Sequence, residues 1–312
     1  MNAPEEKHQS EVSTRDTSNM AGTVRNNLKS ISDKVRAAYM EAPTRTRAKN
    51  LPRLVAVSKT KPKEMILEAY AAGHRHFGEN YVQELEQKSN DPEILKNCPD
   101  IKWHFIGNCQ TKNVTKLAKC KNISVIETIT SEKLADKIQA QYMKKNKEES
   151  LVNVMIQVNT SGEENKNGIE PGSDTLSAVK HIKEKCPNLN IIGLMTIGAL
   201  GHSLASTVQT EEGQNPDFLK LIQCRKEVAD LLHVDDDSLE LSMGMSNDYA
   251  EAISMGSTNV RVGSSIFGAR NYPAKPSENN TTKSSQSEIN SAKDELKITS
   301  ATNDLSKISL NN

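Results

Sequence analysis

The sequence contains no long apolar run and no excess of charge of either sign. Nowhere in its 312 residues do 18 apolar residues stand together, as a membrane-spanning helix requires. The 40 basic side chains balance the 40 acidic ones, so no bulk charge draws the chain toward nucleic acid or an anionic membrane. We therefore expect neither kind of partner, and small-molecule chemistry is the leading class of function.

Cysteine motifs and targeting signals are also missing. The five cysteines are odd in number, lie far apart and include no C-x-x-C pair, so we predict reduced thiols, with no disulfide framework and no zinc site. The first residues, MNAPEEKHQSEVSTRD, lack the basic start and apolar core of a secretory signal. These absences predict a cytoplasmic protein.

The two ends of the chain differ from its middle. Both ends are polar with few aromatic residues and bury too little apolar surface to offset the entropy of ordering. We predict disorder for residues 1–18 and for a polar tail at 272–312. From about Asn19 to Ala42, apolar residues recur at spacings of three and four, which predicts an amphipathic helix. The folded domain is predicted at 19–271.

Eight short apolar runs, separated by segments with helical periodicity, fill the middle of the chain. The runs are 53–59, 74–80, 101–107, 122–128, 151–160, 190–198, 238–245 and 258–268. Eight strands alternating with helices fit an α/β protein with a single (β/α)8 barrel, whose usual size is about 250 residues. An open doubly wound sheet is the alternative, but no G-x-G-x-x-G follows the first run.

The first run, LVAVSK, ends in Lys59. Two interpretations are open. The lysine stem could cover apolar surface with its ammonium in water, or the amine could serve a ligand, since barrels of this kind bind ligands at the C-terminal ends of their strands. Lys61 and Lys63 follow around Pro62, where a helix is predicted to start, although the dipole at a helix start favours anions.

The segments after the seventh and eighth runs are typical of phosphate sites. GMSNDYAEAI passes from a loop into a helix, with Ser246 and Asn247 as candidate caps. In VRVGSSIFG, Gly263 allows close approach of the backbone, and Ser264 and Ser265 offer hydroxyl donors. Loops after strands seven and eight often bind phosphate in this fold. Glycine and serine are also ordinary turn residues, so either segment alone is weak evidence.

A lysine across the barrel mouth from a phosphate site suggests a phosphorylated aldehyde or ketone held as a Schiff base. Pyridoxal 5′-phosphate (PLP) fits, and so does a sugar phosphate in an aldolase. Arg261, on the eighth run, is a permanent cation that needs a partner. Facing a pyridine nitrogen, it would keep the ring unprotonated. A structural salt bridge to an acidic neighbour is the alternative.

The segments AVSKTKP, HFGENYVQE, KWHFIGNCQ, GLMTIG and ELSMGMSNDYAEAISMGSTNVRVGSSIFGAR resemble the pyridoxal phosphate homeostasis protein family, also called the PLP-binding or proline synthetase co-transcribed proteins. The resemblance runs in order over about residues 20 to 272. It implies a single barrel like the N-terminal domain of alanine racemase (PLP fold type III), without the C-terminal β-domain. It also implies a role in intracellular PLP (vitamin B6) homeostasis without firmly assigned turnover.

The resemblance assigns cofactor-binding residues position by position. Lys59 matches the lysine that holds PLP as an internal aldimine, and Arg261 matches the arginine near the pyridine nitrogen. Ser246, Gly263 and Ser264 match the groups that bind the phosphate.

Further positions follow from the same resemblance. Asn80 matches a pocket residue beside the cofactor ring, and Met243 is expected at the pocket wall. We expect Lys61 near the anionic groups of the cofactor. The chain departs from the family where Asn108 and Cys109 replace the usual His and Leu, which puts any role of an imidazole there in doubt.

The main alternative function is a PLP-dependent amino-acid racemase. A two-base racemase needs a second acid/base group, which alanine racemase takes from a second domain, and no such domain can be built here. Tyr81 and His104 are the candidates within the barrel, and both are interpreted as packed aromatic residues. A Schiff-base aldolase would need an acidic partner and a second lysine, which the strand ends do not favour. We therefore predict no catalytic residue.

Metal and protein partners complete the prediction. His74 and His76 alternate along a predicted strand without a cysteine or carboxylate cluster, so no metal site is expected. The implied partners are PLP and apo PLP-dependent enzymes that receive it, and the chain is expected to be a monomer or weak dimer.

Overall fold

The computed structural model describes residues 14–145, 151–163, 166–199 and 213–269. The predicted tail at 272–312 and residues 1–13 of the predicted N-terminal segment lie outside these ranges. The expected amphipathic helix is present as α1, and it begins earlier than expected, since it spans Thr14–Glu41. Its buried face consists of Val24, Leu28, Ile31 and Val35, which confirms the spacing read from the sequence.

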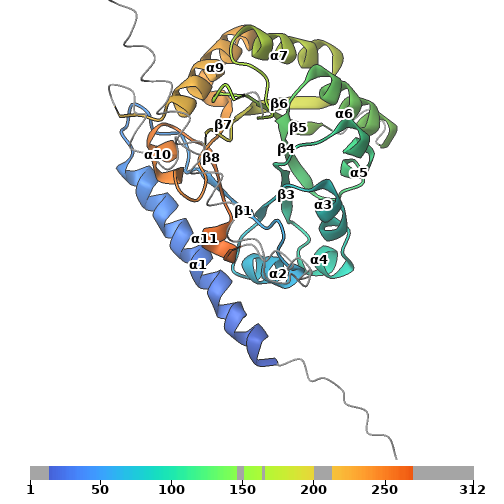
Figure 1. Cartoon of the computed structure of the whole chain (residues 1–312), viewed down its shortest axis with the longest axis vertical. Helices are drawn as coiled ribbons and strands as arrows, with labels where there is room; N and C mark the ends of the chain where they lie inside the picture. The colour runs from blue at the N-terminus through green and yellow to red at the C-terminus, as the bar shows by residue number, and fades with distance from the viewer. Residues whose placement is uncertain (1–13, 146–150, 164–165, 200–212, 270–312) are drawn as a thin grey trace, which may run out of the picture. The chain divides into compact units, whose positions relative to one another are not determined.

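All eight predicted strands are present and close into one parallel barrel (Figure 1). The strands are β1 (Arg53–Val57), β2 (His76–Glu79), β3 (Lys102–Phe105), β4 (Ile123–Ile129), β5 (Val152–Gln157), β6 (Leu189–Met195), β7 (Glu240–Ser242) and β8 (Asn259–Val262). Closure is made by β1 and β8, where Arg53 lies opposite Asn259 and Val55 opposite Arg261. The predicted (β/α)8 barrel is confirmed, and the open sheet considered as its alternative is wrong.

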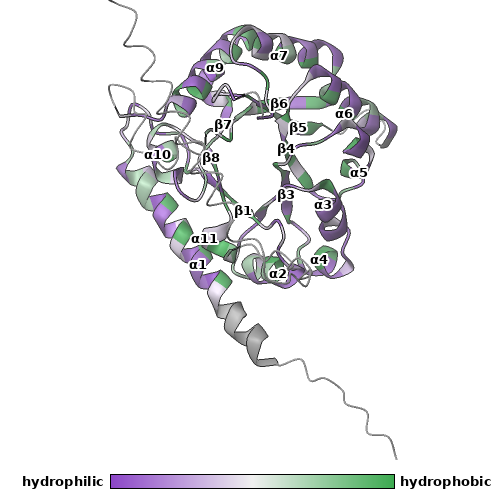
Figure 2. Cartoon of the chain, in the orientation of Figure 1, coloured by the Kyte–Doolittle hydropathy of each residue, from purple (hydrophilic) through white to green (hydrophobic). Residues whose placement is uncertain are grey.

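Helices surround the strands, as Figure 1 shows. They are α2 (Lys63–Ala71), α3 (Val82–Ser89), α4 (Pro92–Asn97), α5 (Val114–Leu117), α6 (Glu132–Lys145), α7 (Ser173–Lys185), α9 (Pro216–Leu232), α10 (Tyr249–Ser254) and α11 (Ser264–Phe267), with short 3-10 turns at η1 (Thr111–Asn113) and η2 (Asp236–Ser238). Figure 2 shows hydrophilic residues along the outer faces of these helices, as expected for a ring of helices exposed on one side. Among the described helices, none combines the length and apolar character needed to cross a membrane.

The sequence explains several helix starts, and one prediction about them is wrong. Asp91 and Asn215 cap α4 and α9 and are each followed by proline, the expected start signal. Ser246 and Asn247 do not cap α10, which begins at Tyr249 with Asp248 in the N-cap position. The Asp248 carboxylate accepts the Met245 N–H at 2.6 Å in the preceding turn.

The core has an outer and an inner part. The outer part joins strand and helix residues and contains the largest buried aromatic side chains, Phe77, Trp103 and Phe105. The inner part contains a small apolar cluster of Val125, Met155 and Met195. Several polar side chains, including His104, Glu127, Ser242, Asn259 and Arg261, are also buried on the barrel strands. Burying polar groups costs free energy unless they are hydrogen-bonded, so these side chains are candidates for a functional role.

Candidate functional site

A cavity of about 220 Å³ lies at the C-terminal ends of the barrel strands. It is lined by Val57, Lys59, Lys61, Asn80, Ile106, Ile197, Met245, Ser246, Arg261, Gly263, Ser264 and Gly268. The structure thus brings together six of the predicted binding residues, which are Lys59, Asn80, Ser246, Arg261, Gly263 and Ser264. These residues come from segments up to about two hundred positions apart, and the barrel places them around one space.

Met243 is the predicted pocket residue that the structure does not place in the cavity lining. Its side chain is fully buried in the outer core. Gly244 follows with φ of +96°, and a Cβ there would meet the Ala252 side chain at 2.6 Å, so glycine is needed to turn the chain. After this turn Met245, which the sequence analysis did not single out, lines the cavity.

The loop that carries Lys59 is held in place by charged residues of β2 and α3. Lys88 donates to the Ser58 carbonyl at 2.8 Å and to the carboxylates of Glu79 and Glu84 at 2.7 Å each. Thr60 has a positive φ of 59°, and its N–H donates to Glu84 at 2.7 Å. Both neighbours of Lys59 are therefore fixed, which directs a partly exposed lysine toward the cavity that it lines.

Lys61 also lines the cavity but is already engaged there. Its side chain is 8% exposed, and its ammonium donates to the Ala269 carbonyl. Burial lowers the pKa of Lys61. The Ala269 contact ties the end of β1 to the segment after α11, and the expected place of Lys61 near the anionic groups of the cofactor stays a prediction.

The loops after β7 and β8 meet at the same cavity, next to the end of β1. The Ser264 and Ser246 hydroxyls are 3.4 Å apart. A Cβ on Gly263 would lie 3.2 Å from the Val57 carbonyl oxygen, so glycine allows these backbones to approach. Ser264 is the first residue of α11, and first-turn N–H groups have no acceptor within their own helix. Hydroxyls and helix-start amides together suit an anionic group.

Asn80 supplies an acceptor without a hydrogen bond. Its Oδ1 is buried, and it has no partner among the residues that the structure describes. Asn80 immediately follows β2 and lines the cavity. A buried polar atom left unsatisfied costs free energy, so its presence here favours a ligand with a polar group near the floor of the cavity.

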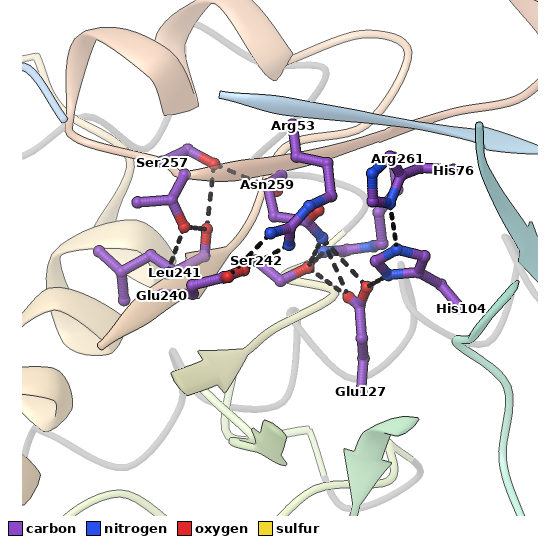
Figure 3. A network of polar contacts seen from close by, with 11 residues as sticks. Arg53, His76, His104, Glu127, Glu240, Leu241, Ser242, Ser257, Asn259 and Arg261 are labelled. Atoms are coloured by element: carbon purple, nitrogen blue, oxygen red, sulfur yellow. Dashed lines mark hydrogen bonds and ion pairs between the residues drawn. The ribbon is translucent and has the colours of Figure 1, made fainter. Parts of the chain in front are cut away.

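Arg261 belongs to a buried network of polar side chains that links four strands (Figure 3). Its guanidinium donates to the Ser242 hydroxyl at 2.5 Å and to the Thr196 carbonyl at 2.7 Å. Ser242 in turn donates to Glu127 at 2.6 Å. The sequence left open whether Arg261 contacts a ligand or forms a direct salt bridge. Within the protein, the Ser242 hydroxyl connects Arg261 to the Glu127 carboxylate.

Glu127 is the acidic centre of this network. It is bonded to His104 Nδ1 at 2.6 Å, and His104 Nε2 lies 2.9 Å from His76 Nδ1. Burial by itself raises the pKa of Glu127, but the contacts with His104, Arg261 and Ser242 outweigh it and lower the pKa. Burial lowers the pKa of His76 to about 3, and the neighbouring side chains of His104 and Arg53 act in the same direction. The carboxylate is therefore ionised, and His76 is neutral near pH 7.

Neither candidate for a second acid/base group lines the cavity. Tyr81 precedes α3, and its side chain is 52% exposed. Its interpretation as a packed aromatic residue is therefore wrong. His104 is fully buried and bonded on both ring nitrogens. Its interpretation as a packed side chain is confirmed, although its contacts are polar.

The histidines considered as metal ligands have other contacts. His74 Nε2 lies 2.7 Å from the His76 carbonyl, and His76 contacts His104. Among the described residues, one group of ligand-type side chains, Asp136, His181 and Cys186, lies close together between α6 and α7. There His181 is already paired with Asp136 at 2.7 Å.

Sequence reasoning missed the network behind Arg261, although one signal was available. Glu127 interrupts the apolar run ISVIET, and a carboxylate within a strand that is otherwise apolar must find partners inside the protein. The family departures have a simple structural account. Asn108 is exposed and bonded to Asn167 at 3.2 Å, and Cys109 is a buried thiol.

Comparisons with known proteins agree with this geometry. The family model for the N-terminal domain of alanine racemase matches residues 32–271. The pyridoxal phosphate homeostasis proteins of Mus musculus and Homo sapiens are 50% and 51% identical to this chain over 254 and 249 residues, which cover 81% and 80% of this chain and 89% and 87% of theirs. The structure of PipY from Synechococcus elongatus PCC7942, with PLP bound, matches with a TM-score of 0.58 at 29% identity, covering 78% of this chain and all (100%) of that one.

Proposed function

Because this chain belongs to the pyridoxal phosphate homeostasis protein family, with the alanine racemase N-terminal fold, we propose that it binds PLP in the cavity through a Schiff base on Lys59. The observation that carries the proposal is the shared cavity. Two lysine amines, two hydroxyls of neighbouring loops and one buried arginine line the same space. These are the groups that an aldehyde, a phosphate and a pyridine nitrogen require.

The residues present fit the cofactor. Asn80 offers a buried acceptor that has no hydrogen bond among the described residues. Ser246, Ser264 and the start of α11 form the anion-binding side, where Gly263 keeps the backbone close to β1. The apolar residues Val57, Ile106 and Ile197 complete the lining and suit an aromatic ring.

Lys59 is the residue that we assign to covalent binding. Its amine attacks the aldehyde carbon, a carbon–nitrogen double bond forms, and one water leaves. The amine must first lose its proton, and a second cation at the same cavity favours that loss, since like charges oppose each other. Lys61 provides that cation. The contacts of Ser58 and Thr60 hold the reacting lysine in the cavity wall.

Arg261 supports a holding role over turnover. PLP supplies an electron sink for amino-acid chemistry, and the sink is strongest when the ring nitrogen is protonated. A permanently charged guanidinium donates hydrogen bonds and accepts none, so it keeps a facing ring nitrogen unprotonated. Arg261 lines the cavity and is 5% exposed. The chain would thus bind PLP with a muted capacity to activate amino acids.

The lining also lacks the acid/base groups of a racemase. Within the described part of the chain, its ionisable side chains are Lys59, Lys61 and Arg261. Lys61 is engaged with the Ala269 carbonyl. We therefore place the chain among proteins that hold and release PLP for vitamin B6 homeostasis, as a cytoplasmic monomer or weak dimer with apo PLP-dependent enzymes as recipients. The alternative function is that of a PLP-dependent amino-acid racemase.

The test combines spectroscopy with chemical trapping. The protein is incubated with PLP, its absorbance is recorded, the Schiff base is reduced with borohydride, and the pyridoxyl peptide is mapped. We expect the label on Lys59 and its loss in Lys59→Ala. Lys63→Ala is the matched control, because Lys63 lies four positions away and is paired with Asp91 and Glu93 at the surface. Label on Lys63 or no label on Lys59 would overturn the assignment. Rapid exchange of the α-proton of added L- or D-alanine would show a racemase instead.

A further inference from the structure

Glu127 is a fully buried carboxylate whose hydrogen-bond donors all come from other strands of the barrel. It receives His104 Nδ1 from β3 at 2.6 Å and the Ser242 hydroxyl from β7 at 2.6 Å. Asn259 Nδ2 of β8 reaches its two oxygens at 3.1 and 3.2 Å. Removing a charge this far from water is costly, so such a group is retained only where its contacts offset the loss of hydration.

Counting donors and acceptors fixes the state of the network. Glu127 is ionised, so it accepts from Asn259 Nδ2 and selects the tautomer of His104 in which Nδ1 carries the proton. The Ser242 hydroxyl has one proton, which it donates to Glu127, and its lone pairs accept from Arg261 and Asn259. The orientation of the Ser242 hydroxyl is thus set by the carboxylate, and that orientation presents an acceptor to Arg261.

Two acceptors then hold the guanidinium of Arg261. Ser242 takes one terminal nitrogen at 2.5 Å, and the Thr196 carbonyl takes the other at 2.7 Å. Both acceptors are neutral, so the negative charges that balance the guanidinium are those of Glu127, one hydroxyl away, and of Asp248. In Figure 3, Glu127 and Arg261 lie on either side of Ser242.

We propose that Glu127 is a positioning residue for the cofactor site, which acts through Ser242 to fix the orientation of Arg261 and to balance its charge behind the pyridine nitrogen. The inference rests on the proposed function, since it assigns the residue that keeps Arg261 directed at the ring. Without the carboxylate, Ser242 is free to turn its proton elsewhere, and the buried guanidinium of Arg261 loses one of its balancing charges.

The experiment measures PLP binding to the apo-protein by spectrophotometric titration. Glu127→Gln, Ser242→Ala and the double variant are compared with the wild type. A charge-assisted hydrogen bond contributes about 1.5–3 kcal/mol, so each single variant should weaken binding at least about ten-fold and shift the absorption maximum of the bound cofactor. Because both changes break one path, their effects should be non-additive in the double variant. Glu127→Asp retains the charge and should bind more tightly than Glu127→Gln.

Glu240→Gln is the matched control. Glu240 lies on the same strand as Ser242, two residues before it, but it pairs with Arg53 at 2.6 Å. This variant should leave the absorption maximum unchanged. Should Glu127→Gln fail to fold by circular dichroism, Ser242→Ala decides. Single variants with wild-type affinity and spectrum, or fully additive effects, overturn the role of Glu127. A wild type that binds no PLP overturns the proposed function itself, so the two failures are distinguishable.

Discussion

Lys88→Met tests whether a buried ion pair holds the loop that carries Lys59. Lys88 has a side chain that is 9% exposed, and its ammonium contacts Ser58, Glu79 and Glu84. Methionine keeps most of the side-chain volume and removes the charge. The Ser58 carbonyl and the Glu79 carboxylate then lose their shared donor, although the Ser58 N–H still donates to the Gly78 carbonyl and the Ser58 hydroxyl to Glu79.

The size of the effect depends on pH, because Glu79 titrates near neutrality. Burial raises the pKa of Glu79 from 4.5 to about 7, and the Lys88 ammonium opposes this rise. A raised carboxylate pKa gives stability that is present below pH 4.5 and is lost as pH rises through about 7. Without Lys88 the folded-state pKa rises further, so the loss extends to higher pH. At pH 8 the unpaired charge should cost about 3–5 kcal/mol, whereas at pH 5.5 Glu79 is mostly neutral and the cost is about 1 kcal/mol, for the lost hydrogen bond to Ser58.

Urea unfolding of the apo-protein at pH 5.5 and pH 8 measures both values. Lys29→Met is the control, because it removes an exposed pair with Asp33 at 2.7 Å on α1 and should change stability by less than about 1 kcal/mol at either pH. Adding Glu79→Gln to Lys88→Met should recover most of the loss at pH 8. Equal destabilisation at the two pH values, or no recovery in the double variant, would refute the reasoning.

Three further outcomes follow from the site and the core. Gly263→Ala places a Cβ 3.2 Å from the Val57 oxygen, so PLP titration should show weaker binding, and unchanged affinity would contradict the need for close approach. Asp248→Ala removes the acceptor of the Met245 N–H at 2.6 Å and should lower the free energy of unfolding in urea by about 1 kcal/mol; no change would assign the turn to other contacts. The five buried cysteines should resist thiol reagents at pH 8 until urea unfolds the chain, whereas rapid labelling of the native protein would show that the core opens.

Much of the fold was predictable because barrel strands leave a strong local signal. Most of the eight runs are short, apolar and followed by a helical pattern, and all eight strands form within or close to the predicted ranges. The site residues from the loops after β1, β7 and β8 were predictable for a related reason, since the fold fixes which strand ends meet. The prediction of Ser246 and Asn247 as caps of α10 failed because Asp248, the third polar residue in a row, precedes the helix, and all three residue types are ordinary helix-start signals.

The network behind Arg261 shows why the rest was not predictable. Glu127 in an apolar run indicates that a buried hydrogen-bond partner exists. Which residue is that partner depends on which inward-facing side chains lie at the same height along the axis of the closed barrel. That level follows from register, as in the pairing of Val55 with Arg261, and a shift of one residue would turn Arg261 away from the interior. No local sequence pattern marks Ser242 or Asn259 as a partner of Glu127. Each contacts Glu127 only because β7 and β8 face β4 across the barrel. A sequence can thus indicate that a charge is buried, whereas the residue that balances the charge is identified only when the strands are aligned in the closed barrel.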